Sequence, residues 1–114
     1  EAEAYPGPSI IIAYCPCLEQ HIKAGMGCTQ TEMKKAVECG YWHLYRYNPD
    51  LKEAGQNPFS LDSKEPTGDF QKFLLGQNRY ASLKLSFPDK ADALYAKAEQ
   101  DAKDRLASYQ NLTK

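Results

Sequence analysis

The chain of 114 residues amounts to one domain or less, because a chain of this length buries a single modest hydrophobic core. Its 14 basic and 15 acidic residues give a net charge of -1 without any basic run, which argues against nucleic acid as a partner. No apolar stretch approaches the roughly 20 residues of a membrane-spanning helix, so a membrane role is equally unsupported.

The N-terminal residues have two interpretations. Residues 1–4, with the sequence Glu-Ala-Glu-Ala, match the processing scar of a yeast secretory leader, in which case the chain is secreted. They also suit the last turn of a helix that ends at Pro6, Gly7 and Pro8, because proline cannot continue a helix. Both interpretations of residues 1–8 stay open at this point.

The most prominent element is the apolar run in residues 8–17. Ile10, Ile11 and Ile12 are β-branched and make both faces apolar, which predicts a strand buried on both sides. Pro8 and Pro16 limit this strand to roughly five to seven residues. Two cysteines, Cys15 and Cys17, lie at the end of this predicted strand. The sequence contains few other strand candidates with which it could pair.

Helices and one aromatic strand are expected in the middle of the chain. Residues 18–24 suit a short helix, and the Thr29–Glu32 capping box predicts a helix over residues 30–39 that ends at Gly40. Alternation over residues 41–47 predicts an aromatic strand, followed by a turn over residues 50–56. Residues 59–62 could pair back on that strand as a hairpin.

The last third of the chain is predicted to be helical. Residues 69–87 carry an apolar helical stripe that Gly76 weakens, and Asp89 is expected to cap a long final helix over residues 90–109. The expected stripe of that helix is Leu94, Ala98, Ala102, then Leu106 or Arg105, and Tyr109. Residues 1–114 therefore predict a helix-rich α/β fragment: a single partial domain with one buried strand, an aromatic strand or hairpin, and three to five helices.

Four cysteines are the first candidates for chemistry: Cys15, Cys17, Cys28 and Cys39. Their spacing is not that of a zinc site. If residues 30–39 are helical, Cys28 and Cys39 lie about 15 Å apart, too far to share a metal or a disulfide. Pairing of Cys17 with Cys28 or with Cys39 stays open, and for each thiol alone a reduced, packed side chain is the favoured interpretation.

The two histidines and the known motifs give no catalytic site. His21 is expected on a helix surface and His43 on a strand, each isolated from other chemical groups. No nucleotide-binding or hydrolase motif is present. We therefore expect no catalytic residue in this chain.

Short sequence pieces from nearly the whole chain match one family. The pieces are Ile12-Ala13-Tyr14, Pro16-Cys17, Gly40-Tyr41-Trp42, Leu44-Tyr45-Arg46-Tyr47-Asn48-Pro49, Asn57-Pro58-Phe59, Leu61-Asp62-Ser63-Lys64-Glu65-Pro66, Gly68-Asp69-Phe70 and Arg79-Tyr80-Ala81-Ser82-Leu83. In these pieces the chain resembles the C-terminal part of pyruvate:ferredoxin (flavodoxin) oxidoreductase, at the end of its thiamine diphosphate-binding domain.

The resemblance implies a parent enzyme of anaerobic metabolism in the cytoplasm. This parent oxidatively decarboxylates pyruvate to acetyl-CoA on thiamine diphosphate with Mg, and [4Fe-4S] clusters pass the electrons to ferredoxin or flavodoxin. The resemblance implies that Cys17 is the remote metal ligand of the cluster nearest the thiamine. The thiamine and Mg ligands match positions before this chain, so we expect the chain to be inactive and to bind no cofactor alone.

Some residues depart from the family pattern. Cys15, residues 18–21 and His43 differ from the residues usual in the family, which puts the turn after Cys17 in doubt. One alternative is a stand-alone binding module held by its cysteines. Another is a homodimer in which two copies cover the exposed edges of the first strand.

Overall fold

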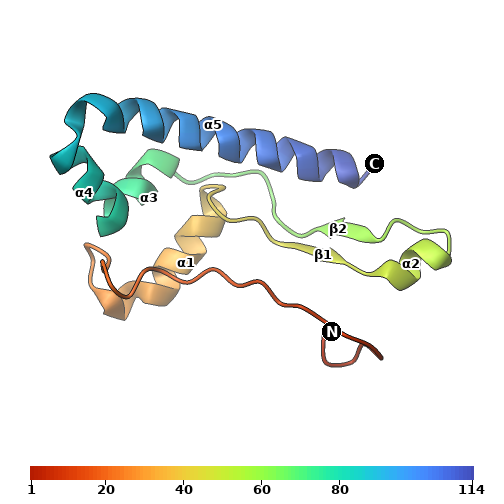
Figure 1. The fold of residues 1–114 in the computed structure, drawn as a ribbon. Helices are drawn as coiled ribbons and strands as arrows, with labels where there is room; N and C mark the ends of the chain where they lie inside the picture. The colour runs from red at the N-terminus through yellow and green to blue at the C-terminus, as the bar shows by residue number, and fades with distance from the viewer.

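Helices dominate the computed structural model, which describes residues 1–114. In chain order the elements are η1 (Met26–Cys28, a 3-10 turn), α1 (Thr29–Glu38), β1 (Tyr45–Tyr47), α2 (Pro49–Glu53), β2 (Phe59–Leu61), α3 (Phe70–Gly76), α4 (Asn78–Ser86) and α5 (Pro88–Leu112). Helix α5 runs along the length of the molecule, above α1, α3 and α4 at one end and near the hairpin at the other (Figure 1). The predicted helix-rich architecture with a long C-terminal helix is confirmed.

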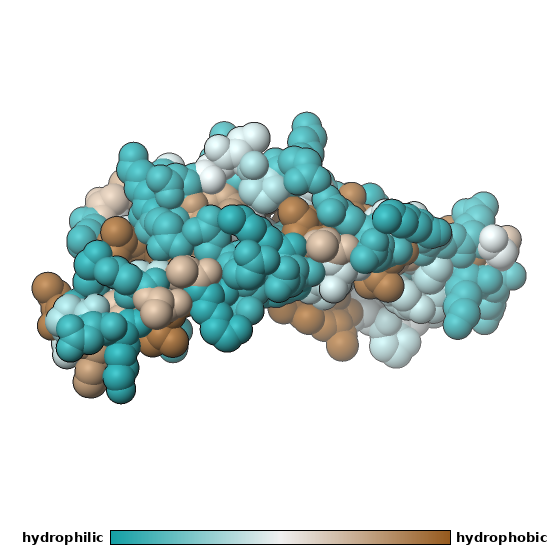
Figure 2. Space-filling view, turned by 90° about the horizontal axis from the view of Figure 1, so that it is seen from above, coloured by the Kyte–Doolittle hydropathy of each residue, from teal (hydrophilic) through white to brown (hydrophobic).

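A small core joins three of the helices, α1, α3 and α5. Leu74 of α3 is fully buried at its centre, and the other members come from α1, α3, α5 and the end of α1: Ala36, Cys39, Phe70, Phe73, Ala91, Tyr95 and Ala102. The predicted stripe of α5 is confirmed at Ala102 and Leu106, which are buried. It is wrong at Leu94, which is half exposed, while Ala91 and Tyr95 are buried near the start of the helix. Seen from above, the face along α5 is mainly hydrophilic, with apolar groups toward its edges (Figure 2).

The aromatic hairpin is confirmed, although its strands are short. Tyr45 pairs with Leu61 and Tyr47 with Phe59 in an antiparallel register. Arg46 closes the hairpin on its outer side, where Nε and Nη2 donate to the two carboxylate oxygens of Asp62 at 2.9 and 2.8 Å. This bidentate pair holds the register, and the Tyr109 ring of α5 packs on the Tyr45 ring with centroids 5.0 Å apart.

The helix starts differ from their predicted caps. Cys28, not Thr29, precedes α1, and Thr29 Oγ1 donates to the carbonyl of Met26. The Glu32 side chain does not return to the helix start, because it turns into the protein interior. Helix α5 likewise begins at Pro88, where a missing N–H costs nothing, and not after an Asp89 cap. Gly40 does follow α1 at a positive φ of 80°, as predicted.

Two predicted elements are absent. Residues 18–24 form turns instead of a helix, since His21 has a positive φ of 64° that interrupts helical geometry. The predicted buried strand is wrong for this chain: residues 8–17 have no strand partner, and Ile10, Ile11 and Ile12 are 88%, 79% and 71% exposed. The physical reason is that the one sheet present has two strands, which already pair with each other.

The molecule exposes an unusually large surface. Its dimensions are 53 × 29 × 22 Å and its accessible surface is 8304 Å². A compact monomer of the same 12.8 kDa mass exposes roughly 6,300 Å². The excess of about 2,000 Å² is on the scale of one side of an obligate interface. None of the helices combines the length and the apolar character needed to cross a membrane.

Replacing Leu74 by alanine tests the core. Because Leu74 is fully buried, we expect Leu74→Ala to lower the free energy of unfolding by about 2–5 kcal/mol. The measurement is urea denaturation of the chain followed by far-ultraviolet circular dichroism. Leu85→Ala is the control, because Leu85 is 86% exposed and its loss should change stability by no more than about 0.5 kcal/mol. Equal effects of the two changes would contradict the assigned core.

Candidate functional site

The candidate site is a shallow hollow of about 170 Å³ beside Cys17. Its lining residues are Tyr14, Cys15, Cys17, His21, Tyr41, Gln77, Arg79 and Tyr80. A larger hollow of about 350 Å³ borders α4, and its lining contains no thiol, imidazole or carboxylate. Of these two hollows, the Cys17 hollow is therefore the one whose lining contains thiols and an imidazole.

A tight turn over residues 17–22, here called the Cys17 turn, shapes this hollow. The His21 N–H donates to the Cys17 carbonyl at 3.0 Å. The Gln20 N–H donates to Cys17 Sγ, with 3.5 Å between nitrogen and sulfur. A thiolate is stabilised by such a donor more than a thiol is, because the donor compensates the negative charge.

Backbone hydrogen bonds attach the Cys17 turn to the junction between α3 and α4. Ile22 forms an antiparallel bridge with Gln77, in which Lys23 N–H donates to the Gly76 carbonyl at 2.9 Å. The Asn78 side chain adds a donor to the Gln20 carbonyl at 2.8 Å. The C-terminal end of the turn is thus fixed to the junction, where Ile22 is buried, whereas Cys17 itself is held by hydrogen bonds within the turn.

The junction itself is fixed by a buried polar contact. Gln77 has an extended backbone that separates α3 from α4, and its Nε2 donates to Glu32 Oε2 of α1 at 2.9 Å. Both side chains are buried, with relative exposures of 5% and 4%. The other Glu32 oxygen accepts from Lys35 Nζ at 2.9 Å, and this bond raises the pKa of Lys35. The carboxylate is thus paired on both oxygens, as a buried charge requires.

An aromatic wall forms the inner side of the hollow. The hydroxyls of Tyr41 and Tyr80 are hydrogen-bonded at 2.7 Å, and the Tyr95 hydroxyl donates to the Tyr80 carbonyl. Burial raises the pKa of Tyr14 to about 12 and also raises the pKa of Tyr41. Tyr14 and Tyr41 therefore stay neutral near pH 7, and Arg79 is the only permanently charged side chain in the lining.

The cysteines do not form a common site. Only Cys15 and Cys17 line the hollow, whereas Cys28 lies in η1 and Cys39 is buried in the core. Burial raises the pKa of the Cys39 thiol, which favours an inert, protonated side chain. All four are free thiols, and no group of three or more His, Cys, Asp or Glu side chains could hold a metal. One or two thiols can give only part of a cluster's ligand set.

The histidines lie in different places. His21 lines the hollow on the Cys17 turn. His43 is not among the residues that line the hollow. It lies just before β1, is buried, and packs edge-on against the Tyr109 ring with centroids 5.6 Å apart. Its Nε2 has no hydrogen-bond partner. Burial, aided by the Arg105 charge, therefore lowers the pKa of His43.

Several residues of the site were not singled out from the sequence. The capping-box interpretation assigned Glu32 to the helix start, and nothing in the sequence indicated that Gln77 would meet it 45 positions away. Gly76 was the one useful signal, because it weakened the predicted helix next to the junction. Arg79 was noted only as part of a family resemblance, and Tyr80 was noted there and as part of the apolar face of the predicted helix.

Comparison with known proteins shows which enzymes the chain is similar to. No family model matches it. It is 58% identical to the pyruvate-flavodoxin oxidoreductase of Enterobacter agglomerans, 54% to that of Klebsiella pneumoniae and 59% to the pyruvate:ferredoxin oxidoreductase of Moorella thermoacetica. Each match covers 112 residues and 98% of this chain, but only 10%, 10% and 9% of the relative.

These relatives are oxidoreductases named for pyruvate and for flavodoxin or ferredoxin. The chain matches a segment of such a pyruvate-flavodoxin or pyruvate:ferredoxin oxidoreductase and spans about one tenth of the length of the curated relatives. The resemblance predicted from short sequence pieces is therefore confirmed. The identity is high and continuous, so the segment is expected to have the same local fold in those enzymes.

Replacing Glu32 tests the polar contact at the junction. Glu32→Ala leaves the buried Gln77 amide without its acceptor, and we expect the free energy of unfolding to fall by about 1–3 kcal/mol. Urea denaturation measures this loss. Glu38→Ala in the same helix is the control: its pair with Lys34 is at the surface and should contribute less than about 1 kcal/mol. A smaller loss in Glu32→Ala than in Glu38→Ala would contradict the account.

The pH dependence of stability tests the environment of His43. Its folded pKa lies below the usual 6.5, so the unfolded chain takes up the proton first as the pH falls. Stability attributable to this residue is present above 6.5 and is lost as the pH falls from there toward the folded pKa. We expect His43→Leu to lose less stability than the wild type between about pH 8 and about pH 5, measured by urea denaturation. Equal losses would show that His43 titrates as in the unfolded chain.

Proposed function

We propose that the chain functions as a segment of a pyruvate:flavodoxin or pyruvate:ferredoxin oxidoreductase and supplies one thiolate, from Cys17, to a [4Fe-4S] cluster. The observation that carries this proposal is the donation of the Gln20 N–H to Cys17 Sγ within a turn whose C-terminal end is fixed to the α3–α4 junction. Hydrogen bonds to ligand sulfurs are one means by which proteins set the reduction potential of such clusters.

The incomplete ligand set supports a shared site. This chain offers one well-placed thiol and no group of three ligands. The remaining ligands of a four-cysteine cluster must therefore come from other parts of a longer polypeptide, in keeping with relatives of which the chain covers about one tenth. When bound, the cluster accepts and passes on single electrons, while the Cys17 turn holds its thiolate in place and Arg79 adds a positive charge nearby.

The wider activity follows from the same proposal. The complete enzyme would oxidatively decarboxylate pyruvate to acetyl-CoA with thiamine diphosphate and Mg, and would deliver the electrons to ferredoxin or flavodoxin. Thiamine diphosphate and Mg would be bound by the rest of the enzyme, since no carboxylate lines the Cys17 hollow. A cytoplasmic location fits four free thiols better than a secreted one, because secreted small domains generally pair their cysteines.

Cysteine variants of a full-length oxidoreductase that carries this segment test the proposal. Cys17→Ala should lower bound iron by about four atoms per chain, because a [4Fe-4S] cluster is lost. Pyruvate-dependent reduction of flavodoxin or ferredoxin should also be lost, and one signal should disappear from the electron paramagnetic resonance spectrum of the reduced enzyme.

Cys28→Ala is the matched control, because Cys28 lies outside the hollow in η1. It should keep the full iron content and the full spectrum. Full iron content in Cys17→Ala, or the loss of a cluster from Cys15→Ala in its place, would contradict the assignment of Cys17.

A further inference from the structure

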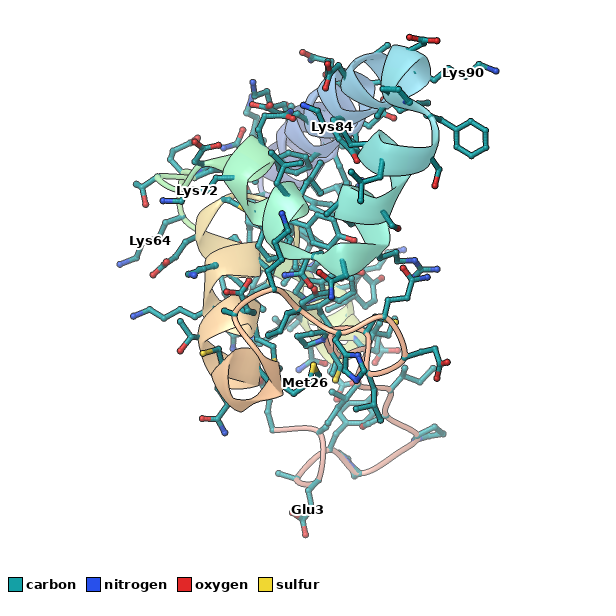
Figure 3. All side chains as sticks on the ribbon, turned by 90° about the vertical axis from the view of Figure 1, so that its left-hand side faces the viewer. Glu3, Met26, Lys64, Lys72, Lys84 and Lys90 are labelled. Atoms are coloured by element: carbon teal, nitrogen blue, oxygen red, sulfur yellow. The ribbon has the colours of Figure 1, made fainter.

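Cys15 and Cys17 place two thiols in the same hollow, with a single residue between them in the chain. Both side chains line the Cys17 hollow of about 170 Å³. Cys15 is exposed and Cys17 is half-buried, so a small molecule can reach both sulfurs. In the end-on view, the N-terminal coil that carries both thiols lies below the helices, and Glu3 near its beginning points away from them (Figure 3).

The other two cysteines are held elsewhere. The thiols of Cys28 and Cys39 each donate to a backbone carbonyl four or three residues earlier in the chain, with 3.6 Å between sulfur and oxygen. Cys39 is buried in the core, and neither residue lines the hollow. Of the other three cysteines, Cys15 is therefore the one that shares a surface hollow with Cys17.

The backbone between the two thiols suits a bridge. Pro16 fixes its own φ and keeps the preceding Cys15 out of helical geometry, and residues 15–17 lie in neither a helix nor a turn. In an extended chain, residues two apart point to the same side, and their Cα atoms lie about 6.6 Å apart. Cα atoms joined by a disulfide usually lie about 4.4–6.8 Å apart, so a bridge requires little movement of the backbone.

We propose that Cys15 and Cys17 form a reversible disulfide when Cys17 holds no metal, with a low-molecular-weight disulfide as the oxidant. The more exposed Cys15 Sγ attacks one sulfur of the oxidant, and the other sulfur leaves as a small thiol with the Cys15 proton. Cys17 Sγ then attacks Cys15 Sγ, and the second small thiol leaves with the Cys17 proton. Two protein thiols are thereby oxidised, and one small disulfide is reduced to two small thiols.

The bridge has a consequence for Cys17 as a ligand. A sulfur in a disulfide cannot bind iron as a thiolate, so the bridge and a cluster exclude each other. A dithiol reverses the bridge, whereas an isolated cysteine can be oxidised further to acids that are not reduced again. This consequence rests on the proposed function, but formation of the bridge does not.

Peptide mass spectrometry of a full-length oxidoreductase that carries this segment tests the inference. The enzyme is depleted of iron with a chelator, treated with oxidised glutathione, alkylated and digested with trypsin. Residues 1–22 contain no lysine or arginine, so the tryptic peptide that ends at Lys23 contains Cys15 and Cys17 but neither of the other two cysteines. We expect this peptide to lose the mass of two hydrogen atoms, to carry no alkyl group, and to regain two alkylatable thiols after treatment with dithiothreitol.

Three results would overturn the inference. The first is alkylation of both Cys15 and Cys17 after the oxidant, which would show that no bridge forms. The second is one glutathione adduct on each of them, which would show that the two sulfurs cannot reach each other. The third is a disulfide that joins the peptide of Cys17 to the peptide of Cys28 or Cys39.

Cysteine variants test the order of the two steps. Cys17→Ala removes the sulfur that closes the bridge, so we expect a stable glutathione adduct to accumulate on Cys15. Cys28→Ala is the matched control, because Cys28 lies in η1 outside the hollow, and it should form the bridge as the wild type does. Absence of an adduct on Cys15 in Cys17→Ala would contradict the attack by Cys15.

The same treatment of the iron-loaded enzyme separates this inference from the proposed function. A cluster on Cys17 should make the bridge form much more slowly than in the iron-depleted enzyme. Equal bridging in the two samples would support the disulfide and contradict the role of Cys17 as a ligand. No bridge in the iron-depleted enzyme would overturn the disulfide, while the iron content of Cys17→Ala would still decide the role of Cys17 as a ligand.

Discussion

The structure depends on one residue, Gln77, whose backbone and side chain make different connections. Its backbone ends α3, begins α4 and bridges Ile22, while its side-chain amide reaches the buried carboxylate of Glu32 in α1. One position thereby joins two helices, the first helix and the Cys17 turn. A side-chain contact of this kind is costly to break because both groups are buried and the Gln77 amide would be left without an acceptor.

This constraint explains why the candidate site can be ordered in a chain with little core. Leu74 is the only large side chain that is completely buried, and residues 17–22 have no secondary structure of their own. The Cys17 turn takes its order from its hydrogen bonds to the α3–α4 junction and from Ile22, the one hydrophobic side chain of the turn that is buried. The sulfur can consequently lie at the surface, where another part of a protein could reach it, and still be held by the Gln20 N–H.

Local signals predicted local structure well. Gly40 marks the end of α1, Asn48-Pro49 separates β1 from α2, and the aromatic residues of β1 pair with β2 as their pattern indicates. Long-range contacts were not predictable in this way. The capping-box pattern at Thr29 and Glu32 was a reasonable local solution, but pairing with Gln77 replaced it. Cys17 was singled out only by resemblance, because a lone thiol has no spacing pattern.

Residues 10–12 show the limit of sequence patterns in a different way. The pattern of Ile10–Ile12 describes a strand with both faces covered, and the chain by itself leaves those side chains exposed. The disagreement has a physical cause, since a strand needs neighbours and this chain keeps its only two strands paired to each other.

An iron anomalous-difference map of a full-length oxidoreductase carrying this segment would test the central claim most directly. The account predicts a [4Fe-4S] cluster with one iron bonded to Cys17 Sγ, its other ligands coming from outside these 114 residues. A cluster bound entirely by cysteines elsewhere, with Cys17 facing solvent, would contradict the account.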